Sequence, residues 1–186
     1  MKKQDIIFAI ICGLSASWIA TDFFGEYGWI FIIILPILSI VGLWVVELIG
    51  KKFLFVHQAG KFALAGTFAD VIDIKVFQLL FIFIPFSLTI KAFSFLTANF
   101  IKYWVNKHWA FEKPGKDGIK KEIVQFFIVA IAGLLINVVS FYCATELIHP
   151  QFGISVRIWT ELSIILAALV AAVWNFLGYK FIVFKK

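Results

Sequence analysis

The chain has 186 residues, of which 62% are hydrophobic and only 15% are charged, and its formal net charge is +6. A soluble domain is about half apolar and about a quarter charged, so this composition excludes an ordinary soluble protein. The mean hydropathy is +0.99, and several apolar runs reach the roughly 20 residues that cross a bilayer core as a helix. The composition therefore predicts an all-α polytopic membrane protein and no binding of nucleic acid.

Six apolar runs, in chain order, predict six transmembrane helices. They cover residues 6–24, 29–49, 62–84, 88–105, 123–147 and 158–177. Short segments rich in glycine or charge separate them, and Pro85 marks a tight turn. The first run follows two lysines and resembles a secretory signal, but a second apolar run comes at once, which favours an uncleaved hairpin.

Most of the lysines fall on one side of this six-span arrangement. The opposite connections carry Asp22, Glu26, Glu146 and His149. Because lysine and arginine are enriched in cytoplasmic loops, we expect a protein of the cytoplasmic membrane with both termini and the loop EKPGKDG in the cytoplasm. The lysines assigned to that side are Lys2, Lys3, Lys51, Lys52, Lys61, Lys107, Lys113, Lys116, Lys120, Lys121, Lys180, Lys185 and Lys186.

The last four spans contain an internal repeat. The stretch KFALAGTFADVIDIKVF aligns with QFFIVAIAGLLINVVSF, which pairs Asp73 with Asn137. Each half then ends in a lysine followed by aromatic residues, in NKHWAF around Lys107 and in YKFIVF around Lys180. Because each half is a two-span hairpin, both halves insert the same way up, and we expect a parallel 2+2 repeat.

From about residue 58 onward the chain resembles the GtrA-like family of small membrane proteins. The resemblance lies in the order of KFALAG opening a span, the acidic Asp73 within it, NKHWAF closing the next span and NFLGYKFIVF closing the last. It implies a four-span fold that moves polyprenyl-phosphate-linked sugars across the membrane for cell-surface polysaccharide synthesis. Lys107 and Lys180 stand where arginine is common in the family. An added hairpin precedes this fold, so we expect two domains, 1–55 and 56–186.

Polar side chains inside apolar spans are costly and usually face a bundle interior or a water-filled cavity. A helix turns about 100° per residue, and on that basis three spans each gather polar residues on one face. These are Asp70 and Asp73 on the third span, Lys91, Asn99, Lys102 and Asn106 on the fourth, and Arg157, Glu161 and Asn175 on the sixth.

The same residues also have purely structural interpretations. Asn99 could tie two helices together, and Asp70 and Asp73 could pair with Lys75 or Lys91. The lysines and rings that end each half could be membrane anchors alone. The alternative is a path for a phosphosugar, with capture by charge and by aromatic faces. On that interpretation the substrate-binding residues are Lys107, Lys180, Asn106, Asn175, Asn99, Lys91, Arg157, Asp70, Asp73, Asn137 and Trp109.

The sequence leaves three functions open. The first is a flippase for a polyprenyl-phosphate-linked sugar, the second an accessory subunit that anchors a glycosyltransferase, and the third a small exporter with Asp70 or Asp73 as proton carrier. There is no Walker loop and the three histidines are scattered, so we expect neither catalysis, nor a cofactor, nor a metal site. The expected partners are the lipid-linked sugar, membrane lipid, a glycosyltransferase and a second copy in a homodimer.

Overall fold

The computed structural model describes residues 1–83, 87–113, 115, 118–151, 153 and 155–185. Of Ser87, Leu88 and Glu161 it describes the backbone alone. The expectations for Pro85, Lys116, Lys186 and the Glu161 side chain lie outside the described residues.

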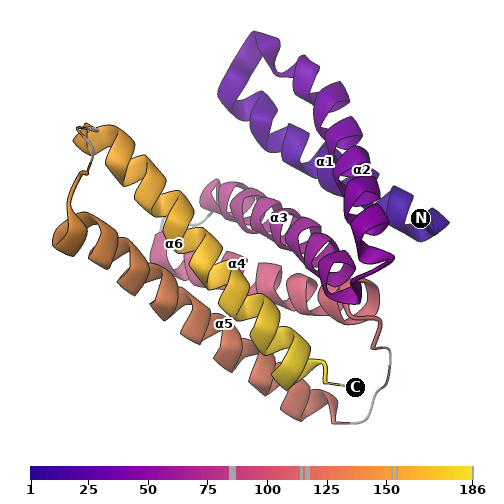
Figure 1. Ribbon diagram of the computed structural model, residues 1–186. Coiled ribbons are helices and arrows are strands. Elements are labelled where there is room, and N and C mark those ends of the chain that lie inside the picture. The colour runs from indigo at the N-terminus through magenta and orange to yellow at the C-terminus, as the bar shows by residue number, and fades with distance from the viewer. Residues whose placement is uncertain (84–86, 114, 116–117, 152, 154, 186) are drawn as a thin grey trace. The chain divides into compact units, whose positions relative to one another are not determined.

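Six α-helices follow the six predicted runs, and the described residues contain no strand, which confirms the all-α prediction (Figure 1). A 3-10 turn, η1, and three π-helical segments, η2 to η4, extend or join them. The elements are α1 (Lys3–Phe24), η1 (Gly25–Tyr27), α2 (Trp29–Gly50), α3 (Leu54–Phe81), α4 (Ser87–Val105), η2 (Asn106–Ala110), α5 (Ile119–Tyr142), η3 (Cys143–Ile148), α6 (Val156–Gly178) and η4 (Tyr179–Val183).

Four helical stretches of the described chain are long and apolar enough to cross a membrane. They are Lys3–Tyr27, Trp29–Gly50, Ile119–Ile148 and Val156–Val183. The helices α3 and α4, which carry charged residues along their length, are not among the four. That α3 and α4 also cross the membrane stays a prediction.

The third helix begins earlier than the sequence indicates. The segment between residues 50 and 61 was predicted as a connection, but α3 already begins at Leu54. A Cβ atom on Gly60 would lie 2.4 Å from Cγ1 of Val46, so the first turns of α3 pack directly on α2. The placement of Lys61 in a loop was therefore wrong: it lies within α3 with 1% of its surface exposed. Its charge suggested solvent, whereas the structure buries it.

The chain forms two compact units, Met1–Pro114 and Gly115–Lys186. The first contains α1 to α4 and η2, and the second contains α5, α6, η3 and η4. This boundary in space does not coincide with residue 55, and the division of the chain into domains 1–55 and 56–186 stays a prediction.

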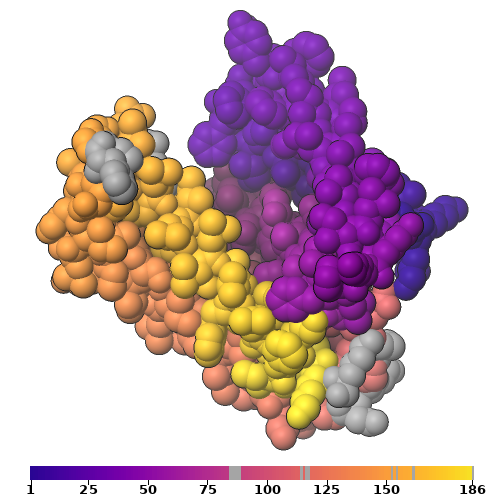
Figure 2. Space-filling view, viewed as in Figure 1, coloured from indigo at the N-terminus to yellow at the C-terminus, as the bar shows by residue number. Residues whose placement is uncertain are grey.

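In the first unit, α1 and α2 form an N-terminal hairpin (Figure 1). A Cβ atom on Gly13 would lie 2.3 Å from Cα of Pro36, which shows how closely the two helices approach. The Oγ atom of Ser17 lies 2.7 Å from the carbonyl oxygen of Phe31 across the pair. Figure 2 shows the outer surface of this hairpin in indigo and purple. Its large exposed side chains are mostly apolar, as expected of a lipid-facing surface.

The core of the first unit joins this hairpin to α3 and to the end of α4. Its buried members are Ala9, Leu43, Ala65, Val105 and Trp109, one each from α1, α2, α3, α4 and η2. Alanine at two of these positions lets the helix backbones approach closely. The hairpin is therefore packed into the unit and is not a separate appendage.

In the second unit, α5 and α6 lie side by side (Figure 1). A Cβ atom on Gly133 would lie 2.3 Å from Oδ1 of Asn175, so only glycine leaves room for this amide against α5. The indole N–H of Trp174 donates to the carbonyl oxygen of Val129 at 3.1 Å. Small residues and interhelical hydrogen bonds, typical of packing in membranes, hold the pair together.

Candidate functional site

Both halves of the repeat end in a π-helix, which the sequence did not predict. Within η2 the N–H of Phe111 donates to the carbonyl oxygen of Asn106 at 2.9 Å, and within η4 the N–H of Phe184 donates to that of Tyr179 at 2.7 Å. The predicted lysine is the second residue of each π-helix. The repeat therefore extends from sequence to an uncommon local conformation that is frequent at functional sites.

The two lysines make equivalent local contacts. The Nζ atom of Lys107 lies 5.7 Å from the ring centre of Tyr103, and that of Lys180 lies 5.8 Å from the ring centre of Phe176. In each case the ring is four residues earlier, on the same face of the helix. Lys107 is 1% exposed, and its ammonium donates to the Tyr103 hydroxyl at 3.3 Å. Lys107 is thus an interior cation of the first unit and not a surface lysine.

Two of the predicted asparagines each have a buried side-chain oxygen that accepts no hydrogen bond from the described residues. The Nδ2 atom of Asn106 donates to the carbonyl oxygen of Lys102 at 2.8 Å. The Oδ1 atoms of Asn106 and Asn175 are buried and accept no hydrogen bond from the described residues. A buried unpaired amide oxygen is costly, so each is an unsatisfied acceptor inside its own unit.

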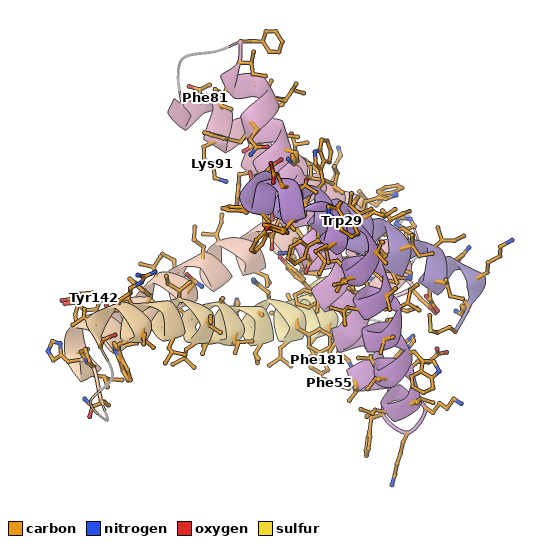
Figure 3. The ribbon with its side chains drawn as sticks, turned by 90° about the horizontal axis from the view of Figure 1, so that it is seen from above. Trp29, Phe55, Phe81, Lys91, Tyr142 and Phe181 are labelled. Atoms are coloured by element: carbon orange, nitrogen blue, oxygen red, sulfur yellow. The ribbon has the colours of Figure 1, made fainter. Side chains whose placement is uncertain are left out.

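A charged cluster links α3 to α4. The Nζ atom of Lys91 lies 2.5 Å from Oδ2 of Asp73, and the hydroxyl of Ser94 donates to the other carboxylate oxygen at 2.6 Å. Ser94 is fully buried, Asp73 is partly buried and Lys91 is half-exposed. Figure 3 shows Lys91 on α4 close to the end of α3 that Phe81 marks. Of the predicted structural pairings, the one between Asp73 and Lys91 is confirmed.

The other predicted residues are spread over both units. Asn99 is buried and donates to the carbonyl oxygen of Phe95 at 2.9 Å. Asp70 is exposed on α3, Asn137 is partly buried on α5, and Arg157 is exposed in the first turn of α6. The structure therefore brings predicted residues together within each unit, and a single site that contains all of them stays a prediction.

A second ion pair connects the hairpin to α3. The Nζ atom of Lys75 lies 2.5 Å from Oδ2 of Asp22 and 4.6 Å from the ring centre of Trp18. A cavity of about 380 Å³ opens beside this pair. Its lining is otherwise mostly apolar and consists of Trp18, Ile72, Lys75, Val76, Gln78, Leu79 and Ile82.

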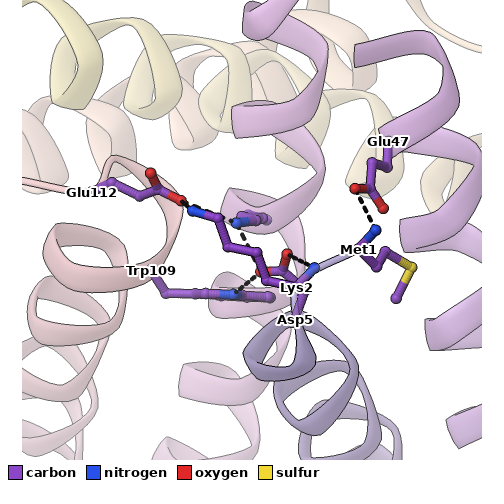
Figure 4. Close-up of polar contacts among 7 residues, drawn as sticks. Met1, Lys2, Asp5, Glu47, Trp109 and Glu112 are labelled. Atoms are coloured by element: carbon purple, nitrogen blue, oxygen red, sulfur yellow. Dashed lines mark hydrogen bonds and ion pairs between the residues drawn. The ribbon is translucent and has the colours of Figure 1, made fainter. Parts of the chain in front are cut away.

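A further polar network, which the sequence did not predict, centres on Asp5 (Figure 4). Its Oδ1 atom lies 2.8 Å from the ammonium of Lys61 and accepts a hydrogen bond of 2.8 Å from the indole N–H of Trp109. Its Oδ2 atom accepts from the backbone N–H of Lys2 at 3.1 Å, which caps the start of α1. The acid in the first turn of an apolar helix was a visible signal for the cap, but nothing local identified Lys61 as its partner.

Glu112 connects this network to the surface. Its Oε1 atom lies 2.9 Å from Nζ of Lys2 and 3.5 Å from Nζ of Lys61. The hydrogen bond from Lys2 holds the pKa of the Glu112 carboxyl below its ordinary value, and the same contact raises the pKa of Lys2. The terminal ammonium of Met1 pairs with Glu47 at 2.6 Å, so both helices of the hairpin are anchored by charge at this end.

A cavity of about 370 Å³ lies next to the network in the first unit. Trp109 belongs to both: its N–H faces Asp5 and its ring forms part of the cavity wall. The ring of Phe8 stacks on Trp109 at 4.8 Å, and Trp104 packs on His108 at 4.2 Å. The lining residues are Gln4, Ile7, Phe8, Trp104, Val105, His108 and Trp109.

Comparison with known proteins gives one match. The family model described as GtrA/DPMS, transmembrane domain, matches residues 61–184. No curated protein and no solved structure matches the chain. In the part of the chain that the structure describes, no three His, Cys, Asp or Glu side chains are grouped in a way that could hold a metal ion. The matched range begins at Lys61 and includes both π-helical endings, but it leaves out the hairpin and Asp5.

Proposed function

Because this chain belongs to the GtrA/DPMS transmembrane-domain family, we propose that it moves a polyprenyl-phosphate-linked sugar across the cytoplasmic membrane. The family match indicates a membrane protein of glycosyl-lipid function. The flippase role and the polyprenyl carrier are our proposal.

The observation that carries the proposal is the cluster of Asp73, Lys91 and Ser94 between α3 and α4. A phosphosugar head group that crosses hydrocarbon needs polar and cationic partners along its path, while its lipid tail can remain in the bilayer. Charges within membrane helices are expensive and typically mark such paths. The cluster supplies a cation, an anion and a hydroxyl in the family domain itself.

We infer that the π-helical ending of each half holds a cation for the phosphate at its cytoplasmic end, Lys180 in the second unit and the interior Lys107 in the first. By the lysine distribution both termini face the cytoplasm, which places Lys107 and Lys180 on the side where the substrate is made. A lysine is a compact charge suited to phosphate. The unused amide oxygens of Asn106 and Asn175 would accept hydrogen bonds from sugar hydroxyls and help to pass the head group inward.

The test is translocation of a fluorescent polyprenyl-phosphate-linked sugar by the purified protein in liposomes. Asp73→Asn keeps the shape of the side chain but removes the charge that holds Lys91, and we expect at least a tenfold slower rate. Lys75→Gln is the matched control, because it removes an ion pair of the same length from the same helix. Equal rates for wild type and a folded Asp73→Asn protein would make Asp73 structural.

A second candidate function is favoured by the hairpin, which lies outside the family match and exposes large apolar side chains. In that case the protein would anchor a glycosyltransferase, and the hairpin would be the docking surface. Replacing the exposed Ile33, Ile37 and Leu38 of α2 by Ala separates the two: loss of a co-purifying glycosyltransferase with liposome transport retained would identify the hairpin as a docking element. The proton-exporter alternative requires transport that depends on pH and that disappears in either Asp73→Asn or Asp70→Asn.

A further inference from the structure

We propose that Lys61 and Trp109 form a binding site for the phosphate of a lipid-linked sugar, and that Asp5 of the hairpin occupies this site until the phosphate displaces it. The identity of the lipid rests on the proposed function, whereas the anion site rests on geometry alone. An ammonium and an indole N–H, each 2.8 Å away, converge on one carboxylate oxygen. Two donors aimed at one point are the geometry of an anion site.

The donors and the acceptor come from different parts of the chain. Lys61 is the first residue of the family match and Trp109 lies within it, whereas Asp5 lies in the added hairpin. The family domain therefore carries the two donors, and the hairpin supplies the anion. Asp5 can compete with a ligand for Lys61 and Trp109 because it lies on a different part of the chain from these two donors.

Burial explains why the site always needs an anion. The Lys61 side chain is 1% exposed and that of Asp5 is 3% exposed. A buried ammonium without a partner is strongly destabilising, so Asp5 can leave only if another anion takes its place. A phosphate brings several strong acceptor oxygens and can satisfy both Lys61 and Trp109.

The charges around the site balance only while Asp5 is present. Glu112 also approaches Lys61, at 3.5 Å, but it is neutralised by Lys2 at 2.9 Å. The four groups are two lysines and two carboxylates. When Asp5 withdraws, one positive charge is left over, which attracts an anion to the site.

The neighbouring cavity supplies room for what is attached to the phosphate. It has about 370 Å³ and shares the Trp109 ring with the anion site. Aromatic faces from Phe8 and Trp104 and polar groups from Gln4 and His108 also line it. This combination of rings and hydrogen-bonding groups suits a sugar.

If Asp5 competes with the ligand, its replacement should tighten ligand binding, whereas replacement of a purely structural carboxylate should not. A competitor that closes the site about 90% of the time lowers the apparent affinity for the ligand about tenfold. Asp5→Asn keeps the shape and the hydrogen-bond acceptor but removes the charge. We therefore expect Asp5→Asn to bind the phosphate ligand at least tenfold more tightly than wild type. A carboxylate that only held the hairpin in place would give equal or weaker binding when replaced.

The experiment measures binding to the full-length protein in detergent with three probes: farnesyl phosphate, farnesol and inorganic phosphate. The matched control is Asp22→Asn, the other α1 carboxylate that pairs with an α3 lysine, and it should bind like wild type. Asp5→Asn combined with Lys61→Gln should lose the gain. Tighter binding of farnesyl phosphate but not farnesol supports the proposal, and a gain for inorganic phosphate as well is expected because the contact is to the phosphate.

Three results would overturn it. Unchanged or weaker binding by Asp5→Asn would leave the ion pair structural, and an equal gain in Asp22→Asn would make the effect a general loosening of the hairpin. A gain for inorganic phosphate alone would show a site that excludes the lipid.

Because Asp5→Asn can lower stability, thermal melting of the same variant with and without phosphate gives a second readout. The proposal requires phosphate to raise the melting temperature of Asp5→Asn more than that of wild type. Binding is measured without transport, so its failure and a failure of the flippase proposal are separate outcomes.

Discussion

Removal of one member of the buried pair between Lys61 and Asp5 should destabilise the first unit far more than removal of an exposed lysine. Both side chains are at most 3% exposed, and their charged atoms are 2.8 Å apart. Breaking such a pair costs about 3–5 kcal/mol because the remaining charge stays buried and uncompensated. We expect the lower end, about 3 kcal/mol, for Lys61→Met, since Asp5 keeps its hydrogen bonds from Trp109 and from the Lys2 backbone.

The measurement is thermal unfolding of the purified protein in detergent, followed by tryptophan fluorescence. For a chain of this size about 1 kcal/mol corresponds to roughly 2–4 °C, so Lys61→Met should melt roughly 6–12 °C below wild type. The control is Lys51→Met, which removes an exposed lysine at the end of α2. The double variant Asp5→Leu with Lys61→Met should recover part of the loss, because no charge is then left buried. Equal melting temperatures for Lys61→Met and Lys51→Met would refute the reasoning.

Three further predictions follow from contacts in the two units. Gly133→Ala should lower the melting temperature by a few degrees, since the new Cβ atom would overlap the Asn175 amide, whereas Gly66→Ala, which meets nothing within 4 Å, should not. Lys2 lowers the pKa of Glu112 in the folded protein. The stability that this carboxylate contributes is therefore fully present above the ordinary pKa of 4.5 and is lost as the pH falls through the lower folded pKa. Glu112→Gln should remove this loss and so flatten the fall of the melting temperature at acidic pH. Replacing Lys107 and Lys180 together by Gln should weaken binding of the lipid-linked sugar at least tenfold, or about 1.4 kcal/mol, and unchanged binding by folded protein would leave both lysines as structural groups.

The sequence predicted the parts of the fold that depend on local apolar pattern. Six helices appear where six apolar runs were found, and the two endings around Lys107 and Lys180 adopt the same conformation. Their π-helical form was not predictable, because the spacing of apolar residues is too similar in a single π-helical turn and in an α-helical turn to tell the two apart. The early start of α3 was missed because Lys61 and its polar neighbours have the composition of a loop.

The pairing of charges was only partly predictable. Helix periodicity placed Asp73 and Lys91 on faces that could meet, and the structure confirms the contact. The contact of Asp5 with Lys61 joins residues from different helices, and the first lies outside the repeat that guided the alignment. Such a pair is set by how α1 packs on α3, which no pattern within either helix specifies.

The two halves of the repeat show what packing alone requires. The alignment of the lysine-containing endings places Ile164 of the second half at the position of Lys91, and the alignment of the opening spans places Asn137 at the position of Asp73. The second half packs α5 against α6 without this pair, so a two-helix hairpin of this family does not need the pair in order to fold. An ion pair that packing does not require is consistent with the transport role proposed for it. Asp73→Asn converts the first half to the residue of the second at this position, and its transport rate in liposomes tests that argument directly.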